Sequence, residues 1–306
     1  MKSLQKWIVS MRPNEVIIIG AGPAGIAAAI QLKRSGLNPA IFEKKKIGGL
    51  LNNANLVENY PGFPGGITGP GLVALFKKQL ESFGIKIIYE QVESVDYENR
   101  LFIVQSESKI TESKSIIIAS GTRPKKTTDF MISDNIKDRV YYDLSDLPDV
   151  EGKNITIIGA GDAAFDYALN LARKNNVAIL NQGHTVKSLP LLYDRARQTD
   201  SIEYLSQIRV LEINESSAGQ LELKCRKNNG DIDIASDYVI FAIGREVRLD
   251  FMTENLKKKR NELEKEGLLH FVGDVNGRIY RQTAIAVGDG ILAAMKIERK
   301  HRGLAL

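Results

Sequence analysis

The sequence predicts an α/β protein of two Rossmann-like dinucleotide-binding domains, each a three-layer ββα arrangement, with the second inserted into the first. Two observations predict this fold. A strand, a glycine-rich turn and a helix follow one another from residue 15, and the same order returns from residue 154. Strands that run into small-residue turns at 115–124 and 237–244 suit the two crossings between domains. We therefore expect residues 1–118 and 249–306 in the first domain and 119–248 in the second.

The first glycine-rich turn, G-A-G-P-A-G at 20–25, has the sequence context of a dinucleotide site. The β-branched run 15–19 before it is typical of a strand buried on both faces, and the alanine-rich helix after it is ended by Gly36. A short strand at 39–42 then leads to Glu43, which is placed to accept hydrogen bonds from a ribose. Strand, turn, helix, strand and acid thus occur in the order that nucleotide binding requires.

Each glycine of this turn has a physical task. Gly20 permits the tight turn, Gly22 lets a pyrophosphate approach the backbone, and Gly25 lets the helix pack close to the strand. The helix N-terminus offers N–H groups and a positive dipole end to phosphates. The alternative is a flavodoxin-like or other α/β crossover that binds no nucleotide.

A second unit of the same kind begins with the buried-strand run 154–158. It continues into G-A-G-D-A-A at 159–164, a helix, and a strand at 177–180. Two such units fit a flavin that exchanges electrons with a nicotinamide.

The end of that second strand lacks the residues that select a nicotinamide dinucleotide. An NADH site would carry Asp or Glu there and an NADPH site Arg, whereas this chain has Asn181 and Gln182. Three basic residues follow later in the chain, and they either contact a phosphate or are solvated surface residues: Lys187, Arg195 and Arg197. We expect the second domain to bind NAD(P)H loosely or only to keep the fold.

The composition is that of a folded protein, because apolar residues make up 43% of the 306 residues and charged residues 26%. Cys225 is the only cysteine, which excludes an intrachain disulfide, and the three histidines lack metal-binding spacing, so we expect no metal site. No apolar run approaches the roughly 18 residues of a membrane span, and the apolar run within residues 1–13 is too short for a signal peptide. We expect a cytoplasmic protein without membrane contact.

The net charge of +5 arises partly from short basic clusters. These lie at 44–46, 77–78, 123–126 and 257–260. Each alone is typical of a solvated face, but together they are suited to an acidic partner protein. No aromatic residues alternate with them and no nucleic-acid-reading motif is present, so we expect no nucleic acid partner.

Two loops and the final helix complete the motifs. Glycine and proline at 48–53 and 57–65 indicate irregular backbone that either wraps a flat ring or simply connects elements. A strand at 270–277 ends in Gly273 and Asp274, and an apolar helix at 281–297 follows, for which simple packing is the plainest interpretation.

These motifs together resemble the low-molecular-weight thioredoxin reductase family of two-domain FAD proteins. The resemblance rests on G-A-G-P-A-G, V-E-N-Y-P-G, G-A-G-D-A-A and G-D-V-N-G-R-I-Y-R-Q-T-A, and it covers nearly the whole chain. It implies a homodimer with FAD in the first fold and a nicotinamide dinucleotide in the second. The FAD residues it implies are Gly20, Gly22, Pro23, Ala24, Gly25, Glu43, Lys44, Gly49, Leu50, Asn59, Ser120, Gly121, Gly273, Asp274, Arg281, Gln282 and Thr283. Those implied for NAD(P) are Gly159, Gly161, Asp162, Ala163 and Ala164.

The chain departs from that family at the redox dithiol. The family carries a C-x-x-C pair and an acid before the second glycine-rich turn, and the matching positions here are Tyr142, Ser145 and Asp146. Cys225 cannot replace the pair, because one thiol cannot form an intramolecular disulfide. The resemblance therefore predicts no dithiol reduction of thioredoxin, and leaves Tyr142, Ser145 and Asp146 as candidate catalytic residues. Tyr142 either covers a flavin or is a core aromatic, and Asp146 is a proton donor or a loop residue.

Three functions remain open. The first is an FAD oxidoreductase that passes electrons between a nicotinamide or other donor and a carrier such as ferredoxin or flavodoxin, as in ferredoxin–NADP reductases of the thioredoxin-reductase type. The second is a flavin oxidoreductase that acts on a small molecule. The third is a non-catalytic flavin-binding sensor.

Overall fold

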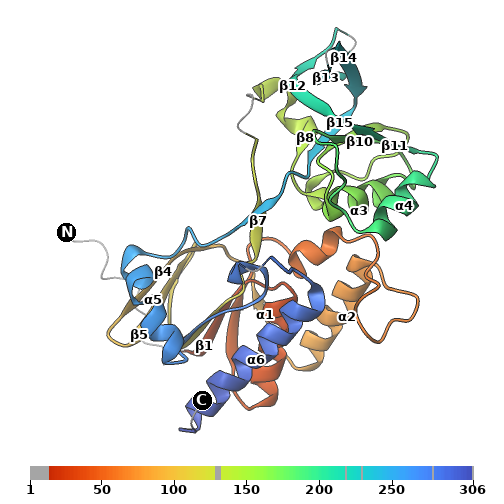
Figure 1. The fold of residues 1–306 in the computed structure, drawn as a ribbon. Coiled ribbons are helices and arrows are strands. Elements are labelled where there is room, and N and C mark those ends of the chain that lie inside the picture. Colours follow the sequence, from red (N-terminus) through yellow and green to blue (C-terminus); the bar gives the residue numbers. More distant parts are fainter. Residues whose placement is uncertain (1–13, 128–131, 218, 229, 278, 305–306) are drawn as a thin grey trace. The chain divides into compact units, whose positions relative to one another are not determined.

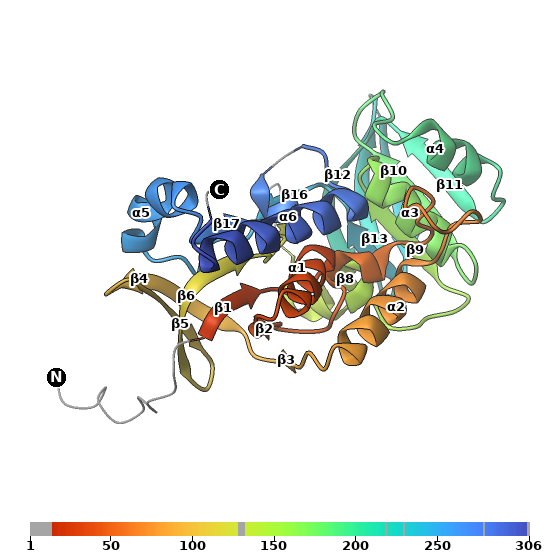
Figure 2. The ribbon, with the colours of Figure 1, turned by 90° about the horizontal axis from the view of Figure 1, so that it is seen from below.

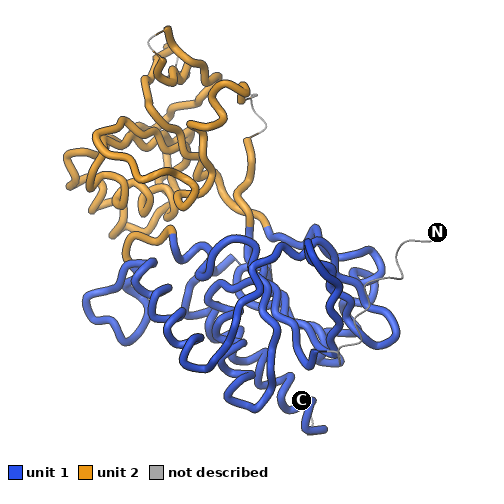
Figure 3. The backbone as a smooth tube through the Cα atoms, turned by 180° about the vertical axis from the view of Figure 1, so that it is seen from behind, with its two compact units in different colours: residues 1–52, 57–122, 247–306 blue, residues 53–56, 123–246 orange. Residues whose placement is uncertain are grey.

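The computed structural model describes residues 14–127, 132–217, 219–228, 230–277 and 279–304. The segment 1–13, whose apolar run is too short for a signal peptide, lies outside this part. The chain forms two compact units (Figure 3). Their residues are 1–52, 57–122 and 247–306 in unit 1, and 53–56 and 123–246 in unit 2. The long crossings thus fall after residues 122 and 246, a few residues from the expected positions, and the short excursion at 53–56 was not expected.

Unit 1 is built on a seven-stranded sheet in which strands far apart in the sequence are neighbours (Figure 1). Its parallel part has the order β3, β2, β1, β6, β17. The antiparallel hairpin of β4 and β5 pairs with the first half of β6. The strands are β1 (Asn14–Ile19), β2 (Pro39–Phe42), β3 (Ile87–Ile88), β4 (Val92–Glu98), β5 (Leu101–Ser106), β6 (Ile110–Ile118) and β17 (Leu269–Phe271).

The apolar runs of these strands form the core of unit 1. Ile17, Ile116 and Phe102 are fully buried in one cluster with residues of β17 and of helix α5 (Glu254–Lys265). The long β-branched stretches of β1 and β6 are buried, as the sequence predicts for parallel strands covered on both faces.

Helix α1 (Pro23–Arg34) packs against α2 (Gly69–Ser82) and, more extensively, against α6 (Thr283–His301), as Figure 2 shows. A methyl group at Gly290 would lie 2.1 Å from the carbonyl oxygen of Ala24, so the two helix backbones are in close contact. The carboxyl-terminal helix is thereby fixed beside the first glycine-rich turn, although the two are at opposite ends of the sequence.

Unit 2 has a five-stranded parallel sheet in the order β11, β10, β9, β15, β8 and a three-stranded antiparallel sheet. Helices α3 (Asp162–Leu171) and α4 (Pro190–Arg197) cover the parallel sheet. The strands are β8 (Val140–Tyr141), β9 (Asn154–Ile158), β10 (Asn176–Asn181), β11 (Ile202–Ser206), β12 (Ile208–Glu215), β13 (Leu221–Lys227), β14 (Gly230–Ser236) and β15 (Tyr238–Phe241).

The connections complete the fold. The crossing strands β7 (Thr122–Pro124) and β16 (Arg245–Val247) pair with each other. Short 3₁₀ turns are η1 (Gly49–Asn53), η2 (Asp134–Arg139), η3 (Leu144–Asp146) and η4 (Gly273–Asn276). Within the described ranges, every helix is too short or too polar to cross a lipid bilayer.

Candidate functional site

The first glycine-rich turn has the geometry that its sequence predicts. Gly20 has φ +105°, and a methyl group there would lie 2.4 Å from the oxygen of Ala119. A methyl group at Gly25 would lie 1.9 Å from the oxygen of Gly20, so only glycine lets α1 pack on the turn. At Gly22, by contrast, a methyl group would meet no atom within 4 Å beyond Gly22 itself and its neighbours in the chain. Gly22 therefore keeps open a space that the protein itself does not fill.

The amino-terminal end of α1 opens onto that space. Gly22 is the N-cap, Pro23 follows it, and the first turn carries neither a side-chain cap nor an acidic residue. The backbone of Gly49 runs alongside, because a methyl group there would lie 3.6 Å from the Cα of Gly22. A helix end of this kind, lined by glycine, suits a phosphate.

The acid at the end of β2 lies next to the same turn. Glu43 accepts a hydrogen bond from the N–H of Ala21 (2.9 Å) through Oε2 and one from the N–H of Lys45 (3.0 Å) through Oε1. These bonds hold the carboxylate at the turn, and its further lone pairs are suited to a ribose.

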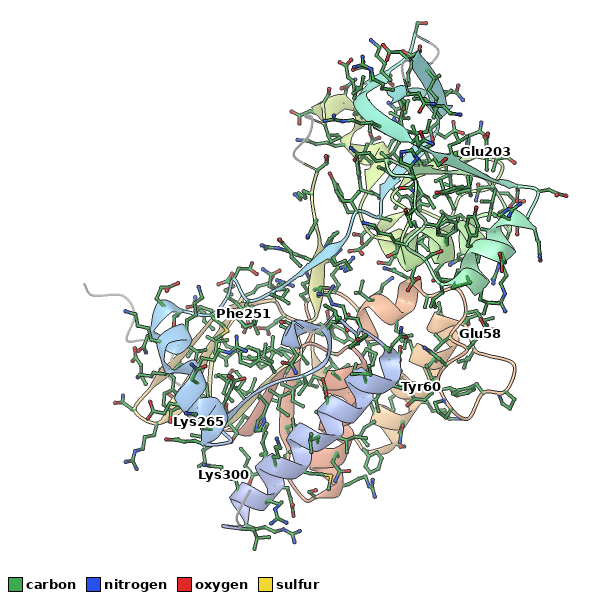
Figure 4. The ribbon with its side chains drawn as sticks, viewed as in Figure 1. Glu58, Tyr60, Glu203, Phe251, Lys265 and Lys300 are labelled. Carbon is green, nitrogen blue, oxygen red and sulfur yellow. The ribbon has the colours of Figure 1, made fainter. Side chains whose placement is uncertain are left out.

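A cavity beside Glu43 is lined by residues of five different chain segments. They are Ile19, Gly20, Phe42, Glu43, Lys44, Glu90, Gln91, Val92, Ser120, Arg248 and Phe251. Phe251 is labelled in Figure 4. The cavity wall is stabilised by the Ser120 hydroxyl, which donates to the oxygen of Arg248 (2.7 Å), and by the N–H of Arg248, which donates to the oxygen of Gly121. Sequence reasoning found Gly20, Glu43, Lys44 and Ser120 but missed Gln91, Arg248 and Phe251, which carry no motif.

The opposite end of the site is formed by η4 and the start of α6. Gly273 has φ +71°, and a methyl group there would lie 3.0 Å from the Cβ of Ala24, so η4 comes close to α1. The N–H of Gly273 donates to Asp289 of α6 (3.2 Å), and Asp274 follows within η4. The predicted residues of three segments therefore meet around the ends of two helices.

The start of α6 has polar groups that the protein does not satisfy. Nε of Arg281 is buried and has no hydrogen-bond partner within the described residues. Gln282, the N-cap, makes no capping hydrogen bond; its Oε1 instead accepts from the amide of Asn59 (3.0 Å). Together with the open space at Gly22, this orphaned donor shows that the residues present fit a bound dinucleotide such as FAD.

The turn of unit 2 repeats this geometry with one change. Gly159 has φ +131° and lies against the oxygen of Ala242, while Gly161, the N-cap of α3, faces open space. Ala164 is fully buried, so a methyl group is accommodated where unit 1 requires Gly25. Ala163 is exposed, and Asp162 in the first turn accepts from the N–H of Leu189 (2.7 Å).

At the end of β10, the side chain of Asn181 is hydrogen-bonded to the loop that follows and to Tyr204. The Asn181 amide donates to the oxygen of Thr185 (3.1 Å) and to the hydroxyl of Tyr204 (2.8 Å), and its Oδ1 accepts from the N–H of Gly183 (3.0 Å). Asn181 thus shapes the 181–185 loop. The polar atoms of its side chain are hydrogen-bonded to other groups of the protein, although this is the position where a residue that selects the nucleotide is expected.

The three candidate catalytic residues lie in unit 2. The ring of Tyr142 stacks on Phe241 at 5.1 Å between centroids, and burial raises the pKa of its hydroxyl. Ser145 is exposed, and its N–H donates to Oδ1 of Asn53 (3.0 Å). Asp146 ends η3 and is exposed. Tyr142 is half-buried and packs against an apolar cluster of unit 2.

Cys225 lies in the antiparallel sheet of unit 2, on β13. Its side chain is only 1% exposed, and burial raises the pKa of its thiol to about 11. A thiol of this kind remains protonated at neutral pH and is a poor nucleophile.

Comparison with known proteins agrees with this geometry. A family model described as pyridine nucleotide-disulphide oxidoreductase matches residues 14–296. The chain is 30% identical to the bifunctional thioredoxin reductase/thioredoxin of Mycobacterium leprae, over 95% of this chain and 67% of that protein. It is also 30% identical to the thioredoxin reductase of Streptomyces clavuligerus, over 95% of each chain.

Solved structures of thioredoxin reductases are also similar to this chain. The Lactococcus lactis thioredoxin reductase in its FR conformation superposes with a TM-score of 0.83 at 26% identity, over 95% of this chain and 100% of that one. The T. acidophilum thioredoxin reductase gives 0.81 at 25% identity, over the same shares. The predicted α/β fold of two dinucleotide-binding domains is thereby confirmed, as is the predicted FAD. The family also binds NADPH, whereas the sequence led us to expect that the second domain binds NAD(P)H loosely or only keeps the fold. The chain belongs to the pyridine nucleotide-disulphide oxidoreductase family.

Proposed function

We propose that the chain is an FAD oxidoreductase without a dithiol relay, which passes electrons between a nicotinamide or other donor and an acceptor outside the chain. One observation carries the proposal: Tyr142 and Ser145 stand where the resemblance places the dithiol, and the single cysteine is buried with its thiol pKa raised to about 11. An intramolecular disulfide needs two thiols that meet, and this sequence contains one.

The residues of unit 1 support the flavin part of the proposal. Gly22 and the end of α1 would hold the pyrophosphate, and Glu43 the adenosine ribose. Arg281 and the start of α6 would hold the ring end, where the positive helix end stabilises negative charge. Bound FAD would supply a ring that accepts an electron pair and releases electrons singly or in pairs.

The acceptor that we favour is a small acidic carrier such as ferredoxin or flavodoxin. The net charge of +5 favours such a partner. However, several residues of the basic clusters are paired within the chain: Lys77 with Glu81, Arg123 with Glu246, Lys257 with Glu254, and Arg260 with Glu264. This pairing favours the second candidate, a small-molecule acceptor such as a quinone.

Anaerobic stopped-flow spectroscopy tests these functions. The flavin is reduced with NADPH, NADH or dithionite and then mixed with oxidised thioredoxin, ferredoxin, flavodoxin or a quinone. We expect no thioredoxin disulfide reduction, and electron transfer to a carrier that slows steeply with added salt. Electron transfer to the quinone alone, independent of salt, would support the small-molecule function. Thioredoxin turnover that Cys225→Ser leaves unchanged would contradict the expectation that a chain without a dithiol cannot reduce thioredoxin.

We also propose that the chain forms a homodimer through α6. The outer face of this helix exposes Ile285 (37%), Leu292 (53%) and Met295 (49%), which recur at helical spacing. Light scattering after gel filtration is expected to give the mass of a dimer for the native chain and of a monomer for Leu292→Lys. A native mass equal to that of one chain would contradict this assembly.

A further inference from the structure

A basic cavity of about 520 Å³ lies in unit 2 where the chain enters it, and the function proposed above does not use it. Arg123, Pro124, Lys125, Lys126 and Glu246 line it. All five belong to unit 2 and come from the two crossings, β7 with the residues that follow it, and β16.

The cavity carries an excess of positive charge. Nε of Arg123 lies 2.7 Å from Oε1 of Glu246, so these two charges compensate each other. Lys125 and Lys126 have no carboxylate within ion-pair distance in the part of the chain that the structure describes, and both are exposed. Two adjacent ammonium groups beside a guanidinium suit an anion that carries more than one charge.

Backbone contacts connect this cavity to the glycine-rich turn of unit 2. The N–H of Lys125 donates to the oxygen of Gly244 (3.0 Å). Gly244 lies two residues beyond Ala242, whose oxygen would be 2.4 Å from a methyl group on Gly159. The basic cavity is therefore held at the carboxyl edge of β9 and β15, where ligands of open α/β sheets bind.

The turn itself lacks a positive side chain. Asp162 places a carboxylate in the first turn of α3, and Asn181 is committed to its own loop. Lys187 also lies near the turn, because its backbone pairs with Gly161, and its side chain is exposed. The end of α3 therefore offers its N–H groups and helix dipole to a pyrophosphate at Gly161, and any further positive charge comes from another segment.

We propose that Lys125 and Lys126 bind the pyrophosphate of the nicotinamide dinucleotide in unit 2, an inference that rests on the nicotinamide-linked function proposed above. Because NAD⁺ and NADP⁺ contain the same pyrophosphate, this contact should contribute equally to the binding of both. Because the end of β10 offers neither an acid for the ribose diol nor an arginine for the 2′-phosphate, unit 2 discriminates little between the two.

Isothermal titration of the full FAD-loaded chain with NAD⁺ and with NADP⁺ tests the inference. The variant Lys125→Gln/Lys126→Gln is expected to raise both dissociation constants about tenfold or more, by similar factors, because charge-assisted hydrogen bonds to phosphate are lost. The matched control is Lys77→Gln/Lys78→Gln, which removes the same charge from an adjacent lysine pair on α2 of unit 1 and is expected to leave both constants unchanged.

A second variant is expected to tighten dinucleotide binding, which a folding defect could not do. Glu246→Gln removes the negative charge from the cavity, so we expect it to tighten both dinucleotides about threefold. The inference is overturned if Lys187→Gln, and not the Lys125/Lys126 pair, weakens binding, if only NADP⁺ responds, or if the native chain binds neither dinucleotide. If the native chain binds neither dinucleotide, enzyme reduced with dithionite can still be tested for electron transfer to ferredoxin or flavodoxin. Failure of the Lys125/Lys126 proposal can therefore be distinguished from failure of the proposed function.

Discussion

The side-chain amide of Asn59 donates a 3.0 Å hydrogen bond to Oε1 of Gln282, although 223 positions separate the two residues in the sequence. Asn59 belongs to a loop whose ends are joined by the Val57–Ile67 bridge, and Gln282 is the N-cap of α6. The bond thus joins the early glycine- and proline-rich loop to the last helix at the ring end of the proposed FAD site.

Gln282→Ala is expected to weaken FAD binding about tenfold, because it removes this bond from the site and leaves the Asn59 amide without its partner. Flavin fluorescence during reconstitution of the apoprotein measures the dissociation constant. Gln79→Ala, an exposed position on α2, is the matched control and is expected to bind FAD as the native chain does. Equal affinities of the two variants would contradict a role of the Asn59–Gln282 bond in holding the flavin.

Two glycines of the first turn are expected to respond differently to alanine. Gly22→Ala adds a methyl group to empty space at an ordinary φ of −76°, so the free energy of unfolding of the apoprotein should stay within about 0.5 kcal/mol of native, while FAD binding is lost. Gly25→Ala drives a methyl group against the oxygen of Gly20 and is expected to destabilise the apoprotein by about 1–3 kcal/mol. Urea denaturation and FAD titration separate the two effects. Gly22→Ala that binds FAD normally would show that the space at Gly22 is not the phosphate site.

The regular parts of this fold were predictable because each follows from a local pattern. The β-branched runs before Gly20 and Gly159 are buried strands, and the glycine turns lead into helices at Pro23 and Asp162, as the sequence predicts. The predicted last helix, 281–297, forms as Thr283–His301. Local sequence sufficed here because strand, turn and helix are formed by consecutive residues.

What depends on distant contacts could not be predicted. The hairpin of β4 and β5 and the three-stranded sheet of unit 2 were missed, since alternating polar strands with one solvated face give weaker signals than buried parallel strands. The cavity residues Gln91 and Phe251 meet only after their segments fold together. The sequence indicated only that Asn181 is not a nucleotide selector, and its three hydrogen bonds within the 181–185 loop and to Tyr204 form only in the folded unit.

His270 is expected to make the stability of the chain depend on pH below neutrality. Burial lowers the pKa of this imidazole from 6.5 to about 4, and the nearby Lys296 and Lys300 act in the same direction. The unfolded chain therefore takes up a proton that the folded chain resists, so stability is present above about pH 6.5 and is lost as the pH falls toward 4, by on the order of 3 kcal/mol. Urea denaturation between pH 7 and 4 measures this loss. His270→Gln should flatten the profile, and a profile that this variant leaves unchanged would contradict the role of His270.

Cys225 is expected to be chemically inert in the folded chain. Its side chain is buried in β13 and its thiol pKa is raised to about 11, so alkylating reagents and disulfide dyes should label it only after denaturant is added. The raised pKa also means that the folded chain holds the thiol proton more tightly than the unfolded chain. Stability contributed by this group is therefore complete below about pH 9 and declines as the pH rises toward 11. Cys225→Ala should lack that alkaline decline and retain the electron-transfer rate, since no step of the proposed function uses sulfur. Rapid labelling of the native protein, or a loss of electron transfer in Cys225→Ala with FAD still bound, would place the thiol in the reaction after all.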